Sequence, residues 1–185
     1  GLNLDLFYTV VFLEELQKIH SSGFAAAMWA HTYLAMTHLN AEGSEQIKRD
    51  YLAPSISGDK IGALCITEPF GGSDVAGMKT TAVKKGNSYI INGSKTFITN
   101  GYLSDLCVVA VKTDVTKGAK GISLVVIETG MKGYTKGKPF EKVGLHAQDT
   151  CELFFENVEV PKENLLGEIN DGFKYLMTEL SQERL

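Results

Sequence analysis

The spacing of apolar residues divides the chain into a helical segment, a strand-rich segment and a second helical segment. Within residues 4–51, apolar positions recur every three or four residues, which is the period of an amphipathic helix. The run 24–39 is apolar on most sides and predicts a largely buried helix. A short third helix is expected to start at Gly43 or Ser44 and to end before Pro54, because proline is poorly tolerated inside a helix.

From residue 61 to about 160, short apolar and β-branched runs alternate with turn signals. Asn92-Gly93 is a strong hairpin signal between two of these runs. The runs 106–111 and 122–127 are mostly continuously apolar, which predicts strands buried on both faces. Short strands at this spacing are typical of a barrel or a sandwich. We expect strands at 61–66, 79–85, 88–91, 94–99, 106–111, 122–127, 150–155 and 158–160.

The last segment follows Pro161 and returns to helical spacing, with Phe173, Leu176, Met177 and Leu180 on one face. This helix is expected to start at Asp171-Gly172 and to reach the end of the chain without a stop signal. A helical segment, a β segment and an unfinished helix together predict a piece of a larger protein.

The composition of the chain argues against several classes of partner and site. The chain has 185 residues, 44% of them hydrophobic, and a formal net charge of −4, so no general affinity for nucleic acid or anionic membranes is expected. Three cysteines without a CxxC spacing argue against a disulfide framework or a zinc site, and the four histidines lack ligand spacing. No metal site is therefore predicted. No membrane span is predicted either, because the run 24–39 is too short and too polar to cross a bilayer.

One turn carries candidate chemistry. The apolar run 61–66 stops at Thr67-Glu68-Pro69, and Gly71-Gly72-Ser73 follows. Two glycines expose backbone N–H groups, and the hydroxyls of Thr67 and Ser73 add polar groups that suit a pyrophosphate. An ordinary turn is the alternative reading. A Rossmann or P-loop site is disfavoured, because no lysine follows the glycines and no helical pattern opens after them.

Three motifs, taken together, resemble the acyl-CoA dehydrogenase family. They are Cys65-Ile-Thr-Glu-Pro-Phe-Gly-Gly-Ser-Asp74, Asn92-Gly-Ser-Lys-Thr-Phe-Ile-Thr-Asn-Gly101 and Phe155-Glu-Asn-Val-Glu-Val-Pro161. Their order and spacing match the family along almost the whole chain. The stretch 143–155 and the ending Leu180-Ser-Gln-Glu-Arg-Leu185 look most like the long-chain branch.

The resemblance implies an α+β multidomain fold. Residues 1–58 would be the end of an α-helical N-terminal domain. Residues 59–161 would form an all-β, barrel-like middle domain that binds FAD and acyl-CoA, and residues 162–185 would start a C-terminal helical bundle.

The resemblance also implies the activity, which is FAD-dependent dehydrogenation of acyl-CoA thioesters to trans-2-enoyl-CoA in fatty-acid β-oxidation, with long-chain substrates favoured. Electrons would pass to an electron-transferring flavoprotein, and the intact enzyme would be a homotetramer in the mitochondrial matrix or, outside eukaryotes, in the cytoplasm. An acyl-CoA oxidase-like enzyme and a non-catalytic β-domain interaction module are the alternatives. The isolated chain is expected to be inactive and to bind FAD weakly.

By resemblance, Thr67 would hydrogen-bond the edge of the flavin ring, and Ser73 would bind the phosphate. Phe97 stands where the family often has tryptophan, and Phe70 departs from a more usual small residue. The complete set of implied cofactor-binding residues is Leu64, Cys65, Ile66, Thr67, Glu68, Pro69, Phe70, Gly71, Gly72, Ser73, Phe97, Ile98 and Thr99.

Glu183 matches one of two positions at which the family places its catalytic base. The alternative is an ordinary solvated helix face, on which Glu179 and Glu183 are four residues apart. Lys120 also fits a solvated loop, and Lys174 stands where relatives often carry an aromatic residue. The implied substrate-binding residues are Ser73, Ala119, Lys120, Lys174, Ser181, Gln182, Glu183 and Arg184.

Overall fold

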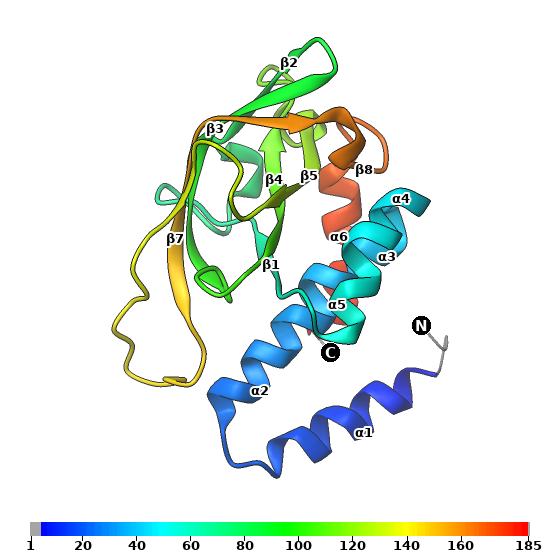
Figure 1. Ribbon diagram of the computed structural model, residues 1–185, viewed down its shortest axis with the longest axis vertical. Helices are drawn as coiled ribbons and strands as arrows, with labels where there is room; N and C mark the ends of the chain where they lie inside the picture. Colours follow the sequence, from blue (N-terminus) through cyan, green and yellow to red (C-terminus); the bar gives the residue numbers. More distant parts are fainter. Residues whose placement is uncertain (1–4, 185) are drawn as a thin grey trace.

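The computed structural model describes the backbone of residues 5–184 and the side chains of residues 5–180. Figure 1 shows the sheet in the upper part of the view, with the helices from both ends of the chain gathered below it and to its right. The long helical stretch predicted at 24–39 is confirmed: α2 (Ser22–Trp29), the π-helical η1 (Ala30–Ala35) and α3 (Met36–Glu42) follow one another without a break. Its burial is partial, since Phe24 is 43% exposed.

The next helical stretch consists of α4 (Glu45–Ile47), the π-helical η2 (Lys48–Leu52) and α5 (Ala53–Ser57). It starts where predicted, because the Ser44 hydroxyl accepts the backbone N–H of Ile47 at 3.2 Å and caps the helix. The prediction that it ends before Pro54 is wrong. Pro54 lies inside this stretch, directly after η2 changes to α5, and the helix ends at the left-handed Gly58.

Helix α1 (Leu6–Gln17) has an apolar face that is mostly exposed. Only Leu16 is buried within it, whereas Phe7 is 75% exposed. In Figure 1 this helix extends along one side of the molecule, away from the sheet.

The middle of the chain forms one eight-stranded sheet in the order β6-β7-β3-β2-β4-β5-β8, with β1 paired to β4. Strands β6 and β8 end this path, so the sheet is not closed, and the barrel-like expectation holds only as an open β domain. The strands are β1 (Gly62–Cys65), β2 (Thr81–Lys85), β3 (Ser88–Thr99), β4 (Leu106–Lys112), β5 (Ile122–Glu128), β6 (Tyr134–Lys136), β7 (Thr150–Pro161) and β8 (Leu165–Leu166), and the short 3-10 helices are η3 (Val75–Gly77), η4 (Gly118–Gly121) and η5 (Lys162–Asn164).

The hairpin predicted at Asn92-Gly93 is wrong, because β3 runs through this point without turning. The pairing of β3 with β7 shifts register between Ile91 and Gly93, and Gly93 has a φ of 144°. The Asn92 side chain accepts the backbone N–H of Asn157 on β7 at 2.9 Å. Asn-Gly therefore forms a β-bulge here, which bends the strand instead of reversing it.

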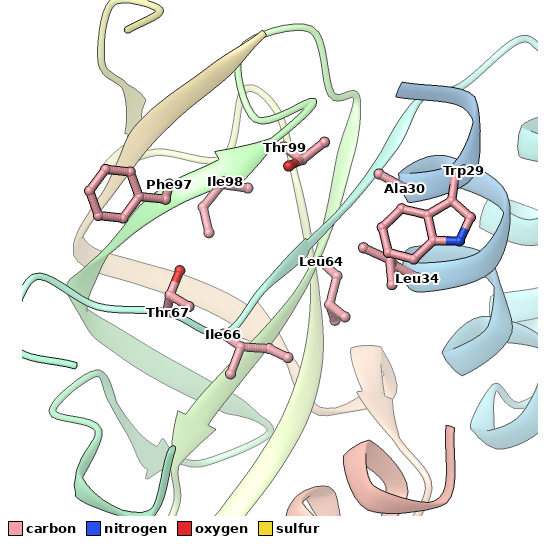
Figure 2. Close-up of a pocket in the computed structure, with 9 residues that line it drawn as sticks. All are labelled: Trp29, Ala30, Leu34, Leu64, Ile66, Thr67, Phe97, Ile98 and Thr99. Carbon is pink, nitrogen blue, oxygen red and sulfur yellow. The ribbon is translucent and has the colours of Figure 1, made fainter. Parts of the chain in front are cut away.

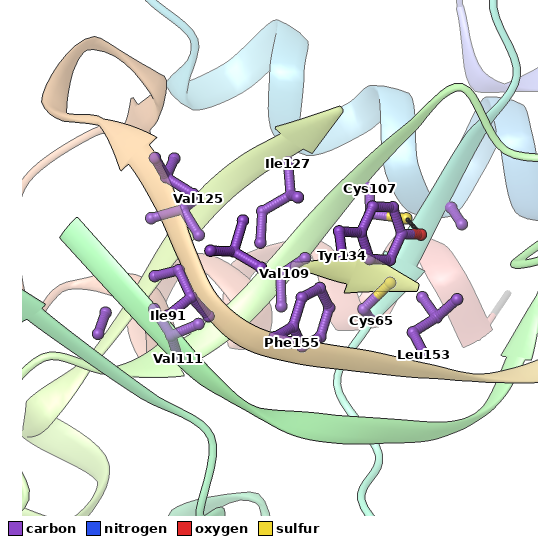
Figure 3. Packing of buried hydrophobic residues seen from close by; sticks show 14 of the residues in the cluster. Cys65, Ile91, Cys107, Val109, Val111, Val125, Ile127, Tyr134, Leu153 and Phe155 are labelled. Atoms are coloured by element: carbon purple, nitrogen blue, oxygen red, sulfur yellow. Dashed lines mark hydrogen bonds between the residues drawn. The ribbon is translucent and has the colours of Figure 1, made fainter. Parts of the chain in front are cut away.

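The two continuously apolar runs are buried on both faces, as predicted. Alternate residues of β4, Cys107, Val109 and Val111, join a core cluster with β3 and β7 (Figure 3). The residues between them, such as Leu106 and Val108, join a second cluster with the helices. Helix α6 (Gly172–Arg184) contributes to that second cluster through Tyr175 and Leu176.

Candidate functional site

A cleft of about 240 Å³ lies where the helical segment meets the sheet. The end of β1 contributes Leu64, and β3 contributes residues 97–99. Across from Leu64, Figure 2 shows the side chains of Trp29 and Leu34 on the helix. The walls of this first cleft are mostly apolar, with the side chains of Thr67 and Thr99 as polar exceptions. The lining residues are Trp29, Ala30, Leu34, Leu64, Ile66, Thr67, Phe97, Ile98 and Thr99.

A second cleft of about 450 Å³ lies between the loop that follows β1 and helix α6. It shares Ile66 and Thr67 with the first cleft. The two clefts therefore meet at the end of β1, and a ligand that fills both would cross Thr67. The lining residues are Ile66, Thr67, Gly72, Ser73, Asp74, Val75, Ala76, Phe173, Leu176, Met177 and Leu180.

Residues 67–73, the cofactor turn, join the two clefts. Glu68 and Gly71 exchange two backbone hydrogen bonds of 3.0 Å, which closes a tight turn with Phe70 82% exposed at its tip. Gly72 passes close to Thr67, since an added Cβ would lie 3.2 Å from its Cγ2. The exposed glycines and Ser73 thus leave backbone and hydroxyl groups accessible along one edge of the second cleft.

The Thr67 hydroxyl has a defined role within the turn. It donates a hydrogen bond to the carbonyl of Thr96 on β3. The backbone N–H of Thr96 in turn donates to the Thr67 carbonyl at 2.9 Å. Because its hydrogen is used in this way, the Thr67 oxygen is oriented to accept a hydrogen bond from a group bound in the cleft.

Phe97 has an unusual backbone conformation for an aromatic residue, with a φ of 56°. It lies at a second register shift of β3 against β7, between Lys95 and Ile98. Its ring is 69% exposed and packs at 5.5 Å and 57° against Phe140. Strained residues in bulges often aim a side chain at a functional site, and here the bulge presents the ring at the first cleft.

A buried ion pair lies beside the cofactor turn. Lys95 Nζ is 2.8 Å from Glu68 Oε1, and the two side chains are 0% and 4% exposed. Burial alone would raise the pKa of Glu68, but Lys95 and the hydrogen bonds from Thr80 and Lys79 lower this pKa below its ordinary value. Burial lowers the pKa of Lys95, and the charge of Glu68 opposes this effect.

The predicted cofactor-binding residues differ in whether their side chains face a cleft. Cys65 is fully buried in the sheet core, and burial raises the pKa of its thiol. The Glu68 side chain is also turned inward, so neither side chain faces a cleft. Leu64, Ile66, Thr67 and residues 97–99 line the first cleft, and Gly72 and Ser73 line the second, whereas Pro69, Phe70 and Gly71 form the exposed outer part of the turn.

The predicted substrate residues divide similarly. Ser73 lines the second cleft. Ala119 and Lys120 lie in η4, which contacts both η3 and α6 next to that cleft without lining it, and Lys174 is exposed on α6. The side chains of Ser181, Gln182, Glu183 and Arg184 lie outside the described residues, although their backbone continues α6.

Sequence reasoning missed the helical wall of the first cleft. Trp29, Ala30 and Leu34 lie where the helix changes from α to π geometry, a feature that often marks functional sites. The single tryptophan of the chain, placed in an apolar helix, was the available signal. The apolar residues of α6 were predicted to share one helix face, and Phe173, Leu176, Met177 and Leu180 all line the second cleft.

The donor set fits a flavin nucleotide. Mostly apolar walls with two threonine hydroxyls suit a heteroaromatic ring, and the glycine turn with Ser73 suits a phosphate. Within residues 5–180, no three His, Cys, Asp or Glu side chains gather as a metal site would require. None of the described helices combines the length and the apolar character needed to cross a membrane.

Comparison with known proteins gives matches along the whole chain. Residues 1–59 match the family description "Acyl-CoA dehydrogenase, N-terminal domain", and residues 63–158 match "Acyl-CoA dehydrogenase, middle domain". The chain is 44% identical to the mitochondrial long-chain specific acyl-CoA dehydrogenase of Sus scrofa, covering 100% of the chain and 43% of that protein. It is 42% identical to the short-chain specific acyl-CoA dehydrogenase of Clostridium acetobutylicum, covering 100% of the chain and 48% of that protein.

Among solved structures, the crystal structure of an acyl-CoA dehydrogenase from Geobacillus kaustophilus superposes with a TM-score of 0.94 at 49% identity. This match covers 100% of the chain and 48% of that structure. The chain thus spans somewhat less than half the length of the proteins that it matches.

Proposed function

Since this chain belongs to the acyl-CoA dehydrogenase family, we propose that the protein of which it forms part oxidises acyl-CoA thioesters to trans-2-enoyl-CoA with FAD. One observation carries the proposal. The apolar cleft between β1, β3 and the helix meets the cleft beside α6 at Thr67, so a flavin and an acyl chain could lie side by side.

The residues that would hold FAD are those of the cofactor turn and of β3. Leu64, Ile66 and Phe97–Thr99 would enclose the ring system, and the Thr67 oxygen would accept a hydrogen bond from its edge. Ser73 and the backbone of the exposed turn would bind the pyrophosphate. When bound, FAD supplies the acceptor for the hydride that leaves the β-carbon of the substrate.

Proton removal from the α-carbon requires a carboxylate in the second cleft. We assign this role to Glu183, because Leu180, one turn earlier on α6, lines that cleft. Ser181, Gln182 and Arg184 would lie along the thioester and pantetheine, and Ser73 would also contact the substrate. Ala119 and Lys120 would lie toward the CoA nucleotide, and Lys174 would contact the substrate where relatives often carry an aromatic residue.

Preference for long-chain substrates rests on the resemblance of residues 143–155 and 180–185 to the long-chain branch. The identities to a long-chain and a short-chain relative differ little, at 44% and 42%. Electron-transferring flavoprotein as the acceptor and a homotetrameric assembly are proposed on the same family grounds. Named relatives are mitochondrial or bacterial, so the proposed location is the mitochondrial matrix in a eukaryote and the cytoplasm otherwise.

The test uses the complete gene product. Turnover of palmitoyl-CoA and of butyryl-CoA is measured with an artificial electron acceptor under anaerobic conditions. Faster turnover of palmitoyl-CoA is expected, and faster turnover of butyryl-CoA would remove the long-chain assignment. Bound flavin without turnover of either substrate would refute the proposed dehydrogenase activity, and peroxide formed in air would instead indicate an oxidase.

A further inference from the structure

Lys95 on β3 is a fully buried lysine whose ammonium group contacts the start of the cofactor turn. Its Nζ atom lies 3.0 Å from the carbonyl oxygen of Ile66 and 2.8 Å from Glu68 Oε1. A third, weaker contact joins it to the sulfur of Met78 at 3.9 Å. These contacts flank Thr67, which with Ile66 lines both clefts.

Glu68 extends this arrangement to the far end of the loop. Its carboxylate accepts the backbone N–H of Lys79 at 2.5 Å and that of Thr80 at 3.0 Å. The side chains of Lys95 and Glu68 therefore join three segments: the end of β1, the approach to β2, and β3. The intervening loop, residues 69–78, contains the exposed Gly71, Gly72 and Ser73, and it is closed at its base by this pair.

The free-energy balance of the pair argues for a positioning role. Burial of two charges carries a large desolvation cost, so an ion pair of this kind adds little stability compared with apolar side chains of similar size. Its directional hydrogen bonds, by contrast, fix the geometry of everything attached to them. Here they fix the two ends of a loop that is otherwise mostly exposed.

We propose that Lys95 is a positioning residue for cofactor binding: with Glu68 it fixes the base of loop 69–78 and so sets where the Thr67 oxygen, the glycine backbone and Ser73 meet the flavin nucleotide. This inference rests on the proposed function for the identity of the ligand. The arrangement of the loop itself can be tested without any ligand.

The test compares variants of the complete gene product. Lys95→Met alone leaves the Glu68 carboxylate buried without its partner and is expected to be unstable. The double variant Lys95→Met with Glu68→Gln removes both charges and keeps one oxygen acceptor where the carboxylate offers two, one to the N–H of Lys79 and one to that of Thr80. Lys136→Met is the matched control, because Lys136 on β6 donates to the carbonyls of Tyr102 and Ser104 in the turn between β3 and β4, away from loop 69–78.

Two measurements decide the outcome. Hydrogen exchange of the amides in residues 69–78 of the apoprotein should accelerate at least about tenfold in the double variant, with exchange in β4 and β5 unchanged. The dissociation constant of the double variant for FAD should rise by a similar factor, even if its melting temperature equals that of the wild type. Lys136→Met should change neither quantity.

Unchanged exchange in loop 69–78 of the double variant would overturn the positioning role, whatever the wild type binds. A double variant that regains both the wild-type melting temperature and the wild-type affinity for FAD would also overturn the positioning role. That result would mean that the ion pair contributes only to stability. If the wild-type protein binds no FAD while the loop exchange responds as expected, the proposed function fails and the role of Lys95 in shaping the loop stands.

Discussion

At the scale of single residues, the candidate site depends on a few side chains with distinct tasks. The Thr67 oxygen is oriented as an acceptor because its hydrogen is donated to Thr96. Phe97 presents its ring from a strained bulge. Lys95 and Glu68 lie beneath the turn and act through its backbone, so residues of the site differ in whether they meet a ligand or shape the surface that does.

The base assignment gives the first prediction. Glu183→Gln in the complete protein should lower kcat by about 10²-fold or more, because the amide cannot take the α-proton, while FAD binding stays unchanged. The measurement is steady-state turnover of palmitoyl-CoA. Glu179→Gln, one turn earlier on the same helix, is the control and should retain nearly full activity. Full activity of Glu183→Gln would assign the base to a glutamate elsewhere.

The ion pair gives a prediction about pH. The pKa of Glu68 is held below its ordinary 4.5 in the folded protein, so folding favours the ionised carboxylate. The resulting stability is complete above the ordinary pKa and is lost as pH falls through the lower, folded-state pKa. Glu68→Gln should therefore cost about 3 kcal/mol of unfolding free energy at neutral pH, and this difference should narrow as pH falls below 4.5.

Denaturant unfolding of the wild type and of Glu68→Gln at several pH values measures that difference. Glu159→Gln on β7 is a suitable comparison, since Glu159 is exposed. A stability difference between wild type and Glu68→Gln that stays constant down to strongly acidic pH would contradict the linkage.

At the scale of elements, the site is built where regular structure is interrupted. The helix that lines the first cleft changes to π geometry at Ala30, and β3 carries two register shifts. The shift nearer to the site exposes Phe97, and the other bends the strand at Gly93. These interruptions let one strand cross from the sheet core to the cleft wall.

The bulge at Gly93 can be tested directly. A Cβ at this position would lie 2.7 Å from Thr80 Cα and 2.6 Å from Thr80 Oγ1, at a φ of 144°. Gly93→Ala should therefore lower the free energy of unfolding by more than about 2 kcal/mol, as measured by chemical denaturation. Gly86→Ala is the control: it shares a positive φ but has open space, so it should cost about 1 kcal/mol. Equal losses would show that the crowding at Gly93 has no effect.

Elements that depend on local pattern could be predicted, and contacts between distant segments could not. The continuous apolar runs that predict burial of both faces of β4 and β5 are visible in the sequence, as is the Ser44 cap. Asn92-Gly93 has the composition of a hairpin, and only its pairing with β7 makes it a bulge. The position of Trp29 in the wall of the first cleft depends on contacts with β1 and β3, and the Lys95 ion pair depends on Glu68. These contacts join residues far apart in sequence, so a local sequence pattern cannot predict them.

At the scale of the whole molecule, one sheet packs against helices that leave large apolar side chains exposed. Helix α1 exposes Phe7, Tyr8 and Val11, and the first cleft is small for a dinucleotide. The chain also spans 43% to 48% of its named relatives. We therefore propose that the two clefts form one side of a larger binding site.

The isolated chain should accordingly bind FAD weakly and lack activity. Gel filtration after incubation with FAD is the measurement, and the protein peak should be colourless and broadened by self-association of its exposed apolar helix. A sharp yellow monomer peak would contradict this prediction and would mean that the described clefts suffice for binding.

Anaerobic titration of the complete holoprotein with palmitoyl-CoA tests most directly whether the two clefts hold a flavin beside an acyl thioester. The visible absorbance of bound flavin is followed without any added electron acceptor. We predict that the absorbance bleaches as trans-2-enoyl-CoA forms, and that Glu183→Gln abolishes the bleaching without releasing the flavin. Flavin that stays bound and oxidised with palmitoyl-CoA and also with butyryl-CoA would contradict the account.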